Sequence, residues 1–156
     1  MMTFLGSGTT SDASWAADGS LYRALAVGDI PGAWLLSLPL LKPGQMERRA
    51  APTMFNCALC LFLVGEYERA LGPLKCAEQS LGGSAELSSA ERKLFVQALE
   101  TSNAALLPLD PEGVAGMERY VLIRVRWLTA LCMLRLNRPE EAWPILRFLE
   151  QYGIKL

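Results

Sequence analysis

The cysteines are the residues of this chain whose type and spacing could most readily support chemistry. Cys57 and Cys60 form a Cys-x-x-Cys pair, a spacing found in zinc sites and in thiol–disulfide centres. A zinc site of this kind would need a second pair, and only the isolated Cys76 and Cys132 remain. The pair also lies inside an apolar segment, whereas reactive cysteines of this spacing stand at exposed helix N-termini. We therefore expect unbonded thiols that pack as small apolar groups and hold no metal.

The absence of histidine excludes most familiar hydrolase mechanisms. Without it there is no Ser-His-Asp or Cys-His nucleophile, no HExxH zinc site and no general base of the commonest kind. The chain has neither a P-loop nor a GxGxxG motif. Glu140 and Glu141 lie in the first turn of the last expected helix, where carboxylates interact favourably with the helix dipole. We therefore expect a protein that is not an enzyme, with no catalytic residue and no cofactor. An enzyme that uses the cysteine pair or a carboxylate site is the alternative from another functional class.

The composition is typical of one globular domain, since 51% of the 156 residues are apolar and 20% are charged. A net charge of -1 provides no overall attraction to nucleic acid or to anionic lipid. No apolar run approaches the ~20 residues needed to cross a bilayer, and the N-terminus lacks the basic start and apolar stretch of a signal peptide. We expect a cytoplasmic protein that binds neither nucleic acid nor membranes, with a flexible lead-in at residues 1–12 and one domain at 13–156.

The elements that would position these residues are helices. Leucine and alanine are abundant, whereas valine, isoleucine and threonine are scarce, and this balance favours helix over strand. Residues 54–64, MFNCALCLFLV, carry no charge, so we expect a helix there that is buried on every side. A single hairpin could not cover such a helix, but a layered stack could. We expect helices at about 13–27, 31–41, 52–64, 67–81, 88–105, 112–136 and 139–152.

Several of these helix ends carry capping residues. Ser88 and Glu91 have the spacing of a capping box, in which each side chain accepts a hydrogen bond from the other residue's backbone N–H. Asp110-Pro111 places an acceptor at an N-cap and a fixed φ at the first helical position, so we expect a helix to begin there. Gly82-Gly83 is expected to end the fourth helix through a left-handed residue.

Three segments align without gaps, which indicates an internal repeat. They are residues 28–34, 65–71 and 137–143. Each begins with a Gly or Asn that tolerates the left-handed region and continues through a short polar turn to an alanine. These alanines are Ala33, Ala70 and Ala142, separated by 37 and 72 residues, close to one and two periods of 36. Since a small residue there lets the second helix approach the first, we expect Ala70 and Ala142 to be buried.

The pattern resembles the tetratricopeptide repeat over about two-thirds of the chain. In the best match, residues 56–81, the family's small, turn, aromatic and packing positions are Ala58, Gly65, Tyr67, Ala70, Leu74 and Ala77. The other two matches keep Gly28 and Ala33, and Ala130, Asn137, Ala142 and Leu146. The resemblance implies an all-α fold, a right-handed α-solenoid of antiparallel helix hairpins with about seven helices and turns near Gly28, Gly65 and Asn137. Residues 82–116 could be a degenerate repeat or an inserted long helix, and a helical bundle with similar punctuation is the alternative fold.

In this family the first helix of each repeat lines a concave face that binds other proteins. Carried onto this chain, the resemblance implies a partner-binding groove lined by Trp15, Tyr22, Phe55, Leu59, Arg124, Trp127, Leu131 and Arg135. The spacing gives independent support, because Arg124, Leu131 and Arg135 lie on one side of a helix with Trp127 at its edge. Aromatic residues beside arginines are typical of interface cores. The same residues could instead form a core that the chain's own N-terminal segment covers.

We therefore expect a protein–protein interaction scaffold that binds an apolar or helical segment of another protein or peptide, or a second copy of this chain. Some cochaperones of the family grip a C-terminal carboxylate with lysines and asparagines on this face. Here those positions hold mainly apolar residues, so that use is not expected. The length and three-repeat layout also resemble small bacterial secretion chaperones, and a chaperone of that kind is the specific alternative.

Overall fold

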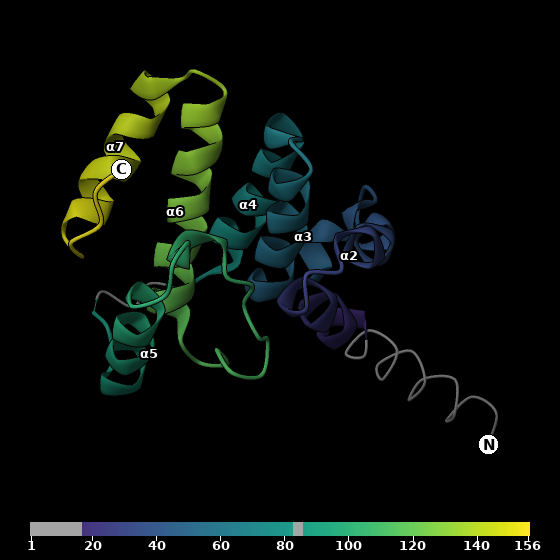
Figure 1. Cartoon of the computed structure of the whole chain (residues 1–156), viewed down its shortest axis with the longest axis horizontal. Coiled ribbons are helices and arrows are strands. Elements are labelled where there is room, and N and C mark those ends of the chain that lie inside the picture. Colours follow the sequence, from purple (N-terminus) through teal and green to yellow (C-terminus); the bar gives the residue numbers. More distant parts are fainter. Residues whose placement is uncertain (1–16, 83–85) are drawn as a thin grey trace.

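The computed structural model describes residues 17–82 and 86–156, and all regular structure in these residues is helical (Figure 1). The predicted all-α class is therefore confirmed for this part of the chain, whereas the expected lead-in at residues 1–12 lies outside it. A first helix runs through residues 17–26. The elements that follow, with η for a 3₁₀ helix, are α2 (Ile30–Ser37), η1 (Leu38–Leu41), η2 (Met46–Arg48), α3 (Ala51–Leu63), α4 (Tyr67–Ser80), α5 (Ser89–Leu99), η3 (Ala104–Leu106), α6 (Glu118–Arg135) and α7 (Pro139–Glu150). None of these helices is both long and apolar enough to span a bilayer.

Three helix–helix connections each turn on one residue in the left-handed region, at the positions that the repeat predicts. Gly28, Gly65 and Asn137 have φ angles of 78°, 85° and 59°. The residue after each of them donates its backbone N–H to the carbonyl oxygen five positions back, at 2.8 Å: Asp29 to Ala24, Glu66 to Leu61 and Arg138 to Met133. This bond is that of a Schellman motif, and it satisfies a carbonyl that the helix end leaves free. The three predicted turns therefore share one structure, which also occurs after α7, where Gly153 has a φ of 75° and Ile154 donates to the carbonyl oxygen of Leu149 at 3.2 Å.

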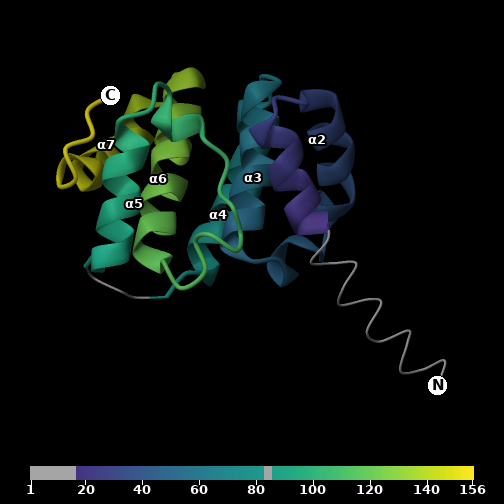
Figure 2. The same cartoon turned by 60° about the horizontal axis from the view of Figure 1, so that its bottom comes forward.

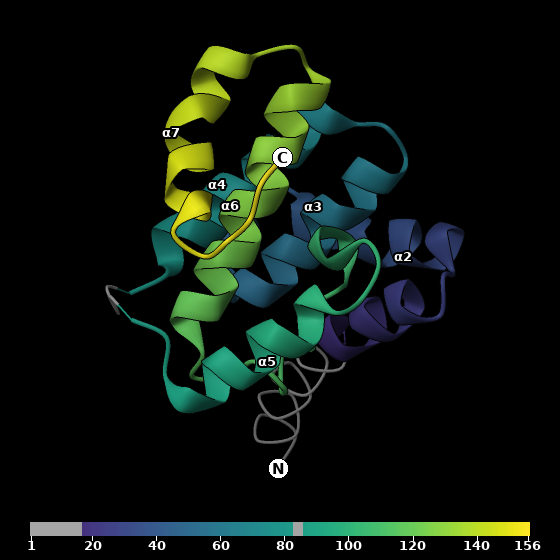
Figure 3. The same ribbon diagram turned by 60° about the vertical axis from the view of Figure 1, so that its left-hand side comes forward.

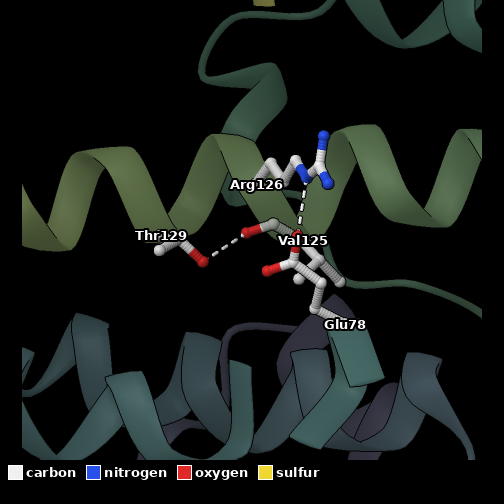
Figure 4. Close-up of polar contacts among 4 residues, drawn as sticks. All are labelled: Glu78, Val125, Arg126 and Thr129. Atoms are coloured by element: carbon white, nitrogen blue, oxygen red, sulfur yellow. Dashed lines mark hydrogen bonds and ion pairs between the residues drawn. The ribbon is translucent and has the colours of Figure 1, made fainter. Parts of the chain in front are cut away.

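Small residues let the two helices of each hairpin pack closely. Ala33, Ala70 and Ala142 have no exposed surface, which confirms the burial predicted for the last two. α3 runs antiparallel to α4, and α6 runs antiparallel to α7 (Figures 1 and 3). α4 also packs against α6 and so joins the two hairpins. At that contact Arg126 donates a hydrogen bond from Nε to Glu78 Oε1 at 2.7 Å (Figure 4).

α3 is the central helix of the fold. Every residue from Thr53 to Phe62 is buried, as expected for a helix that is apolar on all sides. α2, α4 and α6 all pack against it. Its burial explains how a segment without a single charge is accommodated among the other helices.

Residues 100–117, here called the crossing segment, do not form the long helices that the sequence predicts. The helix expected at 88–105 ends at Leu99, and the helix expected at 112–136 begins only at Glu118. Between them the chain makes the short η3 and is otherwise irregular. Figure 2 shows it passing between α5 and α6 on one side and α3 on the other.

Backbone chemistry within the crossing segment explains why the two helices stop. Asn103 and Gly116 have φ angles of 59° and 76°, which the interior of a right-handed helix cannot contain. Asp110 Oδ1 accepts a hydrogen bond from the backbone N–H of Glu112 at 3.1 Å, which closes a turn around Pro111. Asp110-Pro111 therefore opens a turn, and the prediction that it begins a helix is wrong.

The end of α4 also differs from the prediction. α4 ends at Ser80, Leu81 is extended, and Gly82 is not in the left-handed region, whereas Gly83 lies outside the described residues. The backbone N–H of Gly82 donates to Glu118 Oε2 at 3.0 Å. A contact with the start of α6 thus follows α4 in place of the local cap that the two glycines suggested.

The predicted capping box of α5 is confirmed, and its glutamate does more than cap one helix. Glu91 donates its N–H to Ser88 Oγ at 3.2 Å, and Ser88 donates its N–H to Glu91 Oε1 at 3.0 Å. The second carboxylate oxygen of Glu91 accepts the N–H of Tyr120, in the first turn of α6, at 2.8 Å. One buried carboxylate therefore holds the N-termini of α5 and α6 together.

Candidate protein-binding face

The predicted groove lies where α3 and α6 face each other, but its centre is closed. Phe55 and Leu59 on α3 have no exposed surface, and Arg124 and Trp127 on α6 are 1% and 9% exposed. The crossing segment packs into the same apolar core and covers this face. The expectation of an open groove is therefore wrong at these four residues. The cover that the structure shows is the crossing segment, whereas the sequence suggested the N-terminal segment.

The other predicted groove residues lie beside this closed centre. Tyr22 and Leu131 are half-buried, and Arg135 is exposed. Trp15 lies outside the described residues. Tyr22 shares a pocket with Arg124, while Leu131 and Arg135 share another with Trp127. These groove residues thus lie in two separate pockets. One pocket is beside the first half of the crossing segment and the other is beside its second half.

Asn56 holds the crossing segment in place, and sequence reasoning did not single it out. Its Nδ2 donates to the carbonyl oxygen of Leu109, and its Oδ1 accepts the N–H of Leu109, both at 2.8 Å. Asn56 has no exposed surface, so these bonds satisfy groups that water cannot reach. The signal was a single amide inside MFNCALCLFLV, because a polar side chain in a fully buried helix needs a partner.

Arg124 is a buried cation whose polar partners are all uncharged. Its guanidinium donates to the Tyr120 hydroxyl at 2.8 Å and to the carbonyl oxygen of Leu107, and it lies 5.2 Å from the ring centroid of Phe55. Burial lowers the pKa of this guanidinium, and the bond to Tyr120 raises it. Burying an ion costs several kcal/mol, of which cation–π contacts recover about 2 kcal/mol when desolvated. The arrangement therefore holds an incompletely compensated positive charge beside the crossing segment.

The first pocket, here called the Trp127 pocket, is the part of the predicted groove that stays open. It has a volume of about 410 Å³ and lies between the end of α3, α6 and the first half of the crossing segment. Its apolar lining includes Phe62, Leu106, Trp127, Leu131 and Leu156. The C-terminal residues reach it by returning over α6 (Figure 3).

Arg135 forms one wall of the Trp127 pocket. Its guanidinium lies 5.6 Å from the ring centroid of Phe62 and 5.8 Å from that of Tyr67, and it donates to the Tyr67 hydroxyl at 3.3 Å. These contacts hold an exposed positive charge at the edge of an apolar cavity.

The second pocket, here called the Arg124 pocket, has a volume of about 360 Å³. It lies between α5, the start of α6, the second half of the crossing segment and Tyr22 of the first helix. Its lining residues are Tyr22, Leu94, Gln97, Ala98, Leu107, Pro108, Leu109, Asp110, Gly113, Val114, Tyr120 and Arg124.

The cysteine pair does not form a reactive centre. Cys57, Cys60, Cys76 and Cys132 are all free thiols, and all but Cys76 are buried. Burial raises the pKa of Cys57 to about 12, with Cys60 and Asp18 adding to the effect and Arg49 opposing it. Burial likewise raises the pKa of Cys132 to about 12. No cluster of metal-ligating side chains occurs in the residues that the structure describes.

Comparison with known proteins does not assign this chain to a family. No family model matches it, and no curated protein or solved structure matches it significantly. The tetratricopeptide resemblance therefore rests on the repeated turns and alanines alone.

Proposed function

We propose that this chain is a protein-interaction module, built as an α-solenoid of tetratricopeptide type. In this proposal an apolar or helical segment of a partner protein binds in the Trp127 pocket. The Schellman turns at Gly28, Gly65 and Asn137, each followed by a buried alanine, support the repeat. The crossing segment would then be an insertion that fills the middle of the concave face.

One observation carries the proposal: an apolar pocket stays open on the predicted face, with exposed leucines around it. Leu99 lines the pocket and is 42% exposed, and Leu156 lines it and is 52% exposed. Clusters of exposed apolar side chains are uncommon on proteins that bind nothing there. Leu131 and Trp127 line the same pocket and are less exposed, so an apolar side chain of a partner would become buried on binding.

The composition of the pocket favours a protein segment as its occupant. Aromatic residues and arginine are enriched in interface cores, and here Phe62 and Trp127 lie beside Arg135. A helical segment could insert one or two large apolar residues, while Arg135 would contact a carboxylate or backbone carbonyl at its edge. The pocket volume lies near the lower end of the roughly 300–1,000 Å³ range of binding cavities.

Partner capture by a variant with a carboxylate in the Trp127 pocket would test this function. Leu131→Glu places a carboxylate in the pocket at a half-buried position, so it should reduce capture of partners from lysate by about tenfold or more. Leu35→Glu is the matched control, because Leu35 is 67% exposed on α2 and lies outside the pocket lining. Thermal unfolding of both variants should stay close to that of the parent protein.

A photo-reactive phenylalanine analogue in place of Leu99 would show what enters the pocket. We expect it to cross-link to an apolar segment of the same partner that the parent captures and Leu131→Glu loses. Cross-links only between copies of this chain would identify self-association as the use of the pocket. Equal capture by Leu131→Glu and Leu35→Glu, with both folded, would refute the proposal.

A further inference from the structure

The Arg124 pocket has the features of a small-molecule site and is separate from the Trp127 pocket. Apolar side chains from α5 and the crossing segment form most of its wall. Gln97 and Gly113 are exposed and line it, so the cavity reaches solvent beside them. Arg124 and Tyr120 also line it, and both are buried. The lining therefore combines exposed residues, apolar side chains and a buried cation.

The charge of Arg124 has no counter-ion in the part of the chain that the structure describes. The ion pairs there involve Arg126 and Arg138, and Arg124 takes part in none. Its Nε–H makes no hydrogen bond although the atom is buried. Asp110 lines the same pocket, but its carboxylate accepts from the backbone of Glu112 and does not pair with Arg124.

The groups around Arg124 stabilise a cation without neutralising it. The Tyr120 hydroxyl and the Leu107 carbonyl offer partial negative charge, and the faces of Phe55 and Tyr120 add their quadrupoles. None of these carries a full negative charge. A buried arginine without a counter-ion attracts an anion, and the planar donors of its guanidinium match the geometry of a carboxylate.

We propose that the Arg124 pocket binds a small apolar carboxylate, with its anionic group at Arg124 and its acyl or aryl body against Leu94, Leu109 and Val114. Gln97 is an exposed polar residue of the lining and could contact a polar substituent on the ligand. Asp110 on the wall disfavours a second negative charge there. The pocket thus selects one anionic end and one apolar end.

The lining favours a free small molecule over the C-terminus of a peptide. A peptide would bring backbone N–H and C=O groups into a cavity in which half of the lining residues are leucine, proline, valine or alanine. Those groups would lose water without gaining partners, and that loss is costly. An acyl or aryl chain has no such groups.

Titration with matched probes tests the proposal on the full-length protein. The probes are octanoate, octanamide with the same body but no charge, and acetate with the charge but no body. We expect octanoate to bind more tightly than octanamide by at least about tenfold, as a charge-assisted hydrogen bond in a buried site provides. Acetate should bind too weakly for calorimetry to detect, because it fills none of the apolar wall.

Three variants locate the binding. Arg124→Met keeps the volume of the side chain without its charge, and should remove the preference for octanoate while octanamide still binds. Leu94→Trp fills the cavity without changing Arg124, and should abolish binding of both probes even if Arg124→Met proves too unstable to study. Arg147→Met removes an exposed arginine on α7 and should leave every affinity unchanged.

Several results would overturn the proposal. These are equal affinities of the parent protein for octanoate and octanamide, an undiminished preference in Arg124→Met, or undiminished octanoate binding in Leu94→Trp. A leucine-ended peptide with a free carboxylate that binds more tightly than octanoate would replace the small molecule by a chain terminus. None of these results bears on partner capture at the Trp127 pocket, so the two proposals fail independently.

Discussion

At the scale of single residues, buried polar groups connect parts of this protein that are far apart in sequence. Glu91 joins the starts of α5 and α6, and Asn56 joins α3 to the crossing segment. Arg124 reaches the same segment at Leu107. Each of them is at most 4% exposed, so its contribution depends on complete hydrogen bonding rather than on surface charge.

The Glu91 carboxylate should make stability depend on pH. Burial raises the pKa of Glu91. Hydrogen bonds from the N–H groups of Ser88 and Tyr120 and from the Ser88 hydroxyl lower this pKa by more than burial raises it, so the net shift is downward. A lowered pKa in the folded state means that the carboxylate stabilises the protein above its unfolded pKa of about 4.3, and that this contribution is lost as pH falls. Glu91→Gln should therefore cost about 1.5–3 kcal/mol at neutral pH and progressively less below pH ~4.

Denaturant unfolding at several pH values measures this effect. The exposed Glu112 is the matched control, and Glu112→Gln should shift the unfolding free energy by less than about 0.5 kcal/mol at neutral pH. If the loss in Glu91→Gln is the same at pH 7 and at pH 3.5, the carboxylate is not the stabilising group.

Thiol reactivity should follow burial rather than the Cys-x-x-Cys spacing. With a pKa of about 12, roughly one Cys57 thiol in ten thousand is ionised at pH 8, and only the thiolate reacts. Cys76 is the partly exposed cysteine, so it should be labelled first in the native protein. Labelling kinetics followed by peptide mass spectrometry would show this, and Cys76→Ser should remove the fast phase. Fast native labelling of Cys57 would contradict its burial.

At the scale of elements, the hairpins depend on small residues at fixed places. Ala70 has no exposed surface where α4 meets α3, so no space exists for a larger side chain. Ala70→Leu should overpack this contact and lower the unfolding free energy by about 1–3 kcal/mol. The exposed Ala26 is the matched position, and Ala26→Leu should change stability by less than about 0.5 kcal/mol. Coincident denaturant midpoints for Ala70→Leu and the parent would show that the packing is looser than described.

The crossing segment should depend on one side chain of α3. Asn56→Leu keeps the size of the residue but leaves the N–H and C=O of Leu109 without partners in the core, which should cost about 2–4 kcal/mol. Hydrogen exchange at residues 104–114 should accelerate more than exchange in α4. In the control Thr129→Val, the lost bond to the Val125 carbonyl is local to α6 (Figure 4), so exchange in the crossing segment should not change. Unchanged exchange at 104–114 in Asn56→Leu would exclude Asn56 as the anchor.

At the scale of the whole molecule, the face between α3 and α6 serves mainly as core. The crossing segment fills its centre, and the Trp127 and Arg124 pockets lie beside the first and second halves of that segment. Binding at the Trp127 pocket and binding at the Arg124 pocket would therefore both act on residues 100–117. A ligand in one pocket could change the other through this shared segment.

The burial of Trp127 leads to a whole-molecule prediction. Because its side chain is 9% exposed beneath the crossing segment, Trp127→Ala should lower the unfolding free energy by about 3–5 kcal/mol. Trp143 is 59% exposed on α7, and Trp143→Ala should cost less than about 1 kcal/mol. Equilibrium denaturation of the two variants measures the difference. A small loss in Trp127→Ala would mean that the face is open in solution.

Much of the fold could be predicted because its signals are local. A left-handed Gly or Asn, a polar turn and a small alanine lie within a few positions of one another, so Gly28, Gly65 and Asn137 mark their turns without reference to distant residues. The capping box at Ser88 likewise needs only Glu91. The groove residues could be predicted only as a set on one side of two helices, since periodicity shows which side chains share a face but not what lies over it.

The helical class, the three turns, the buried alanines and the burial of residues 53–62 in α3 could all be predicted from local patterns of residues. The filling of the predicted groove could not, because the path of residues 100–117 depends on contacts with distant residues. Leu109 is 53 positions from the Asn56 that binds it, and Leu107 is 17 positions from Arg124. Such bonds form only after α3 and α6 have packed together, so no spacing within the segment could reveal them.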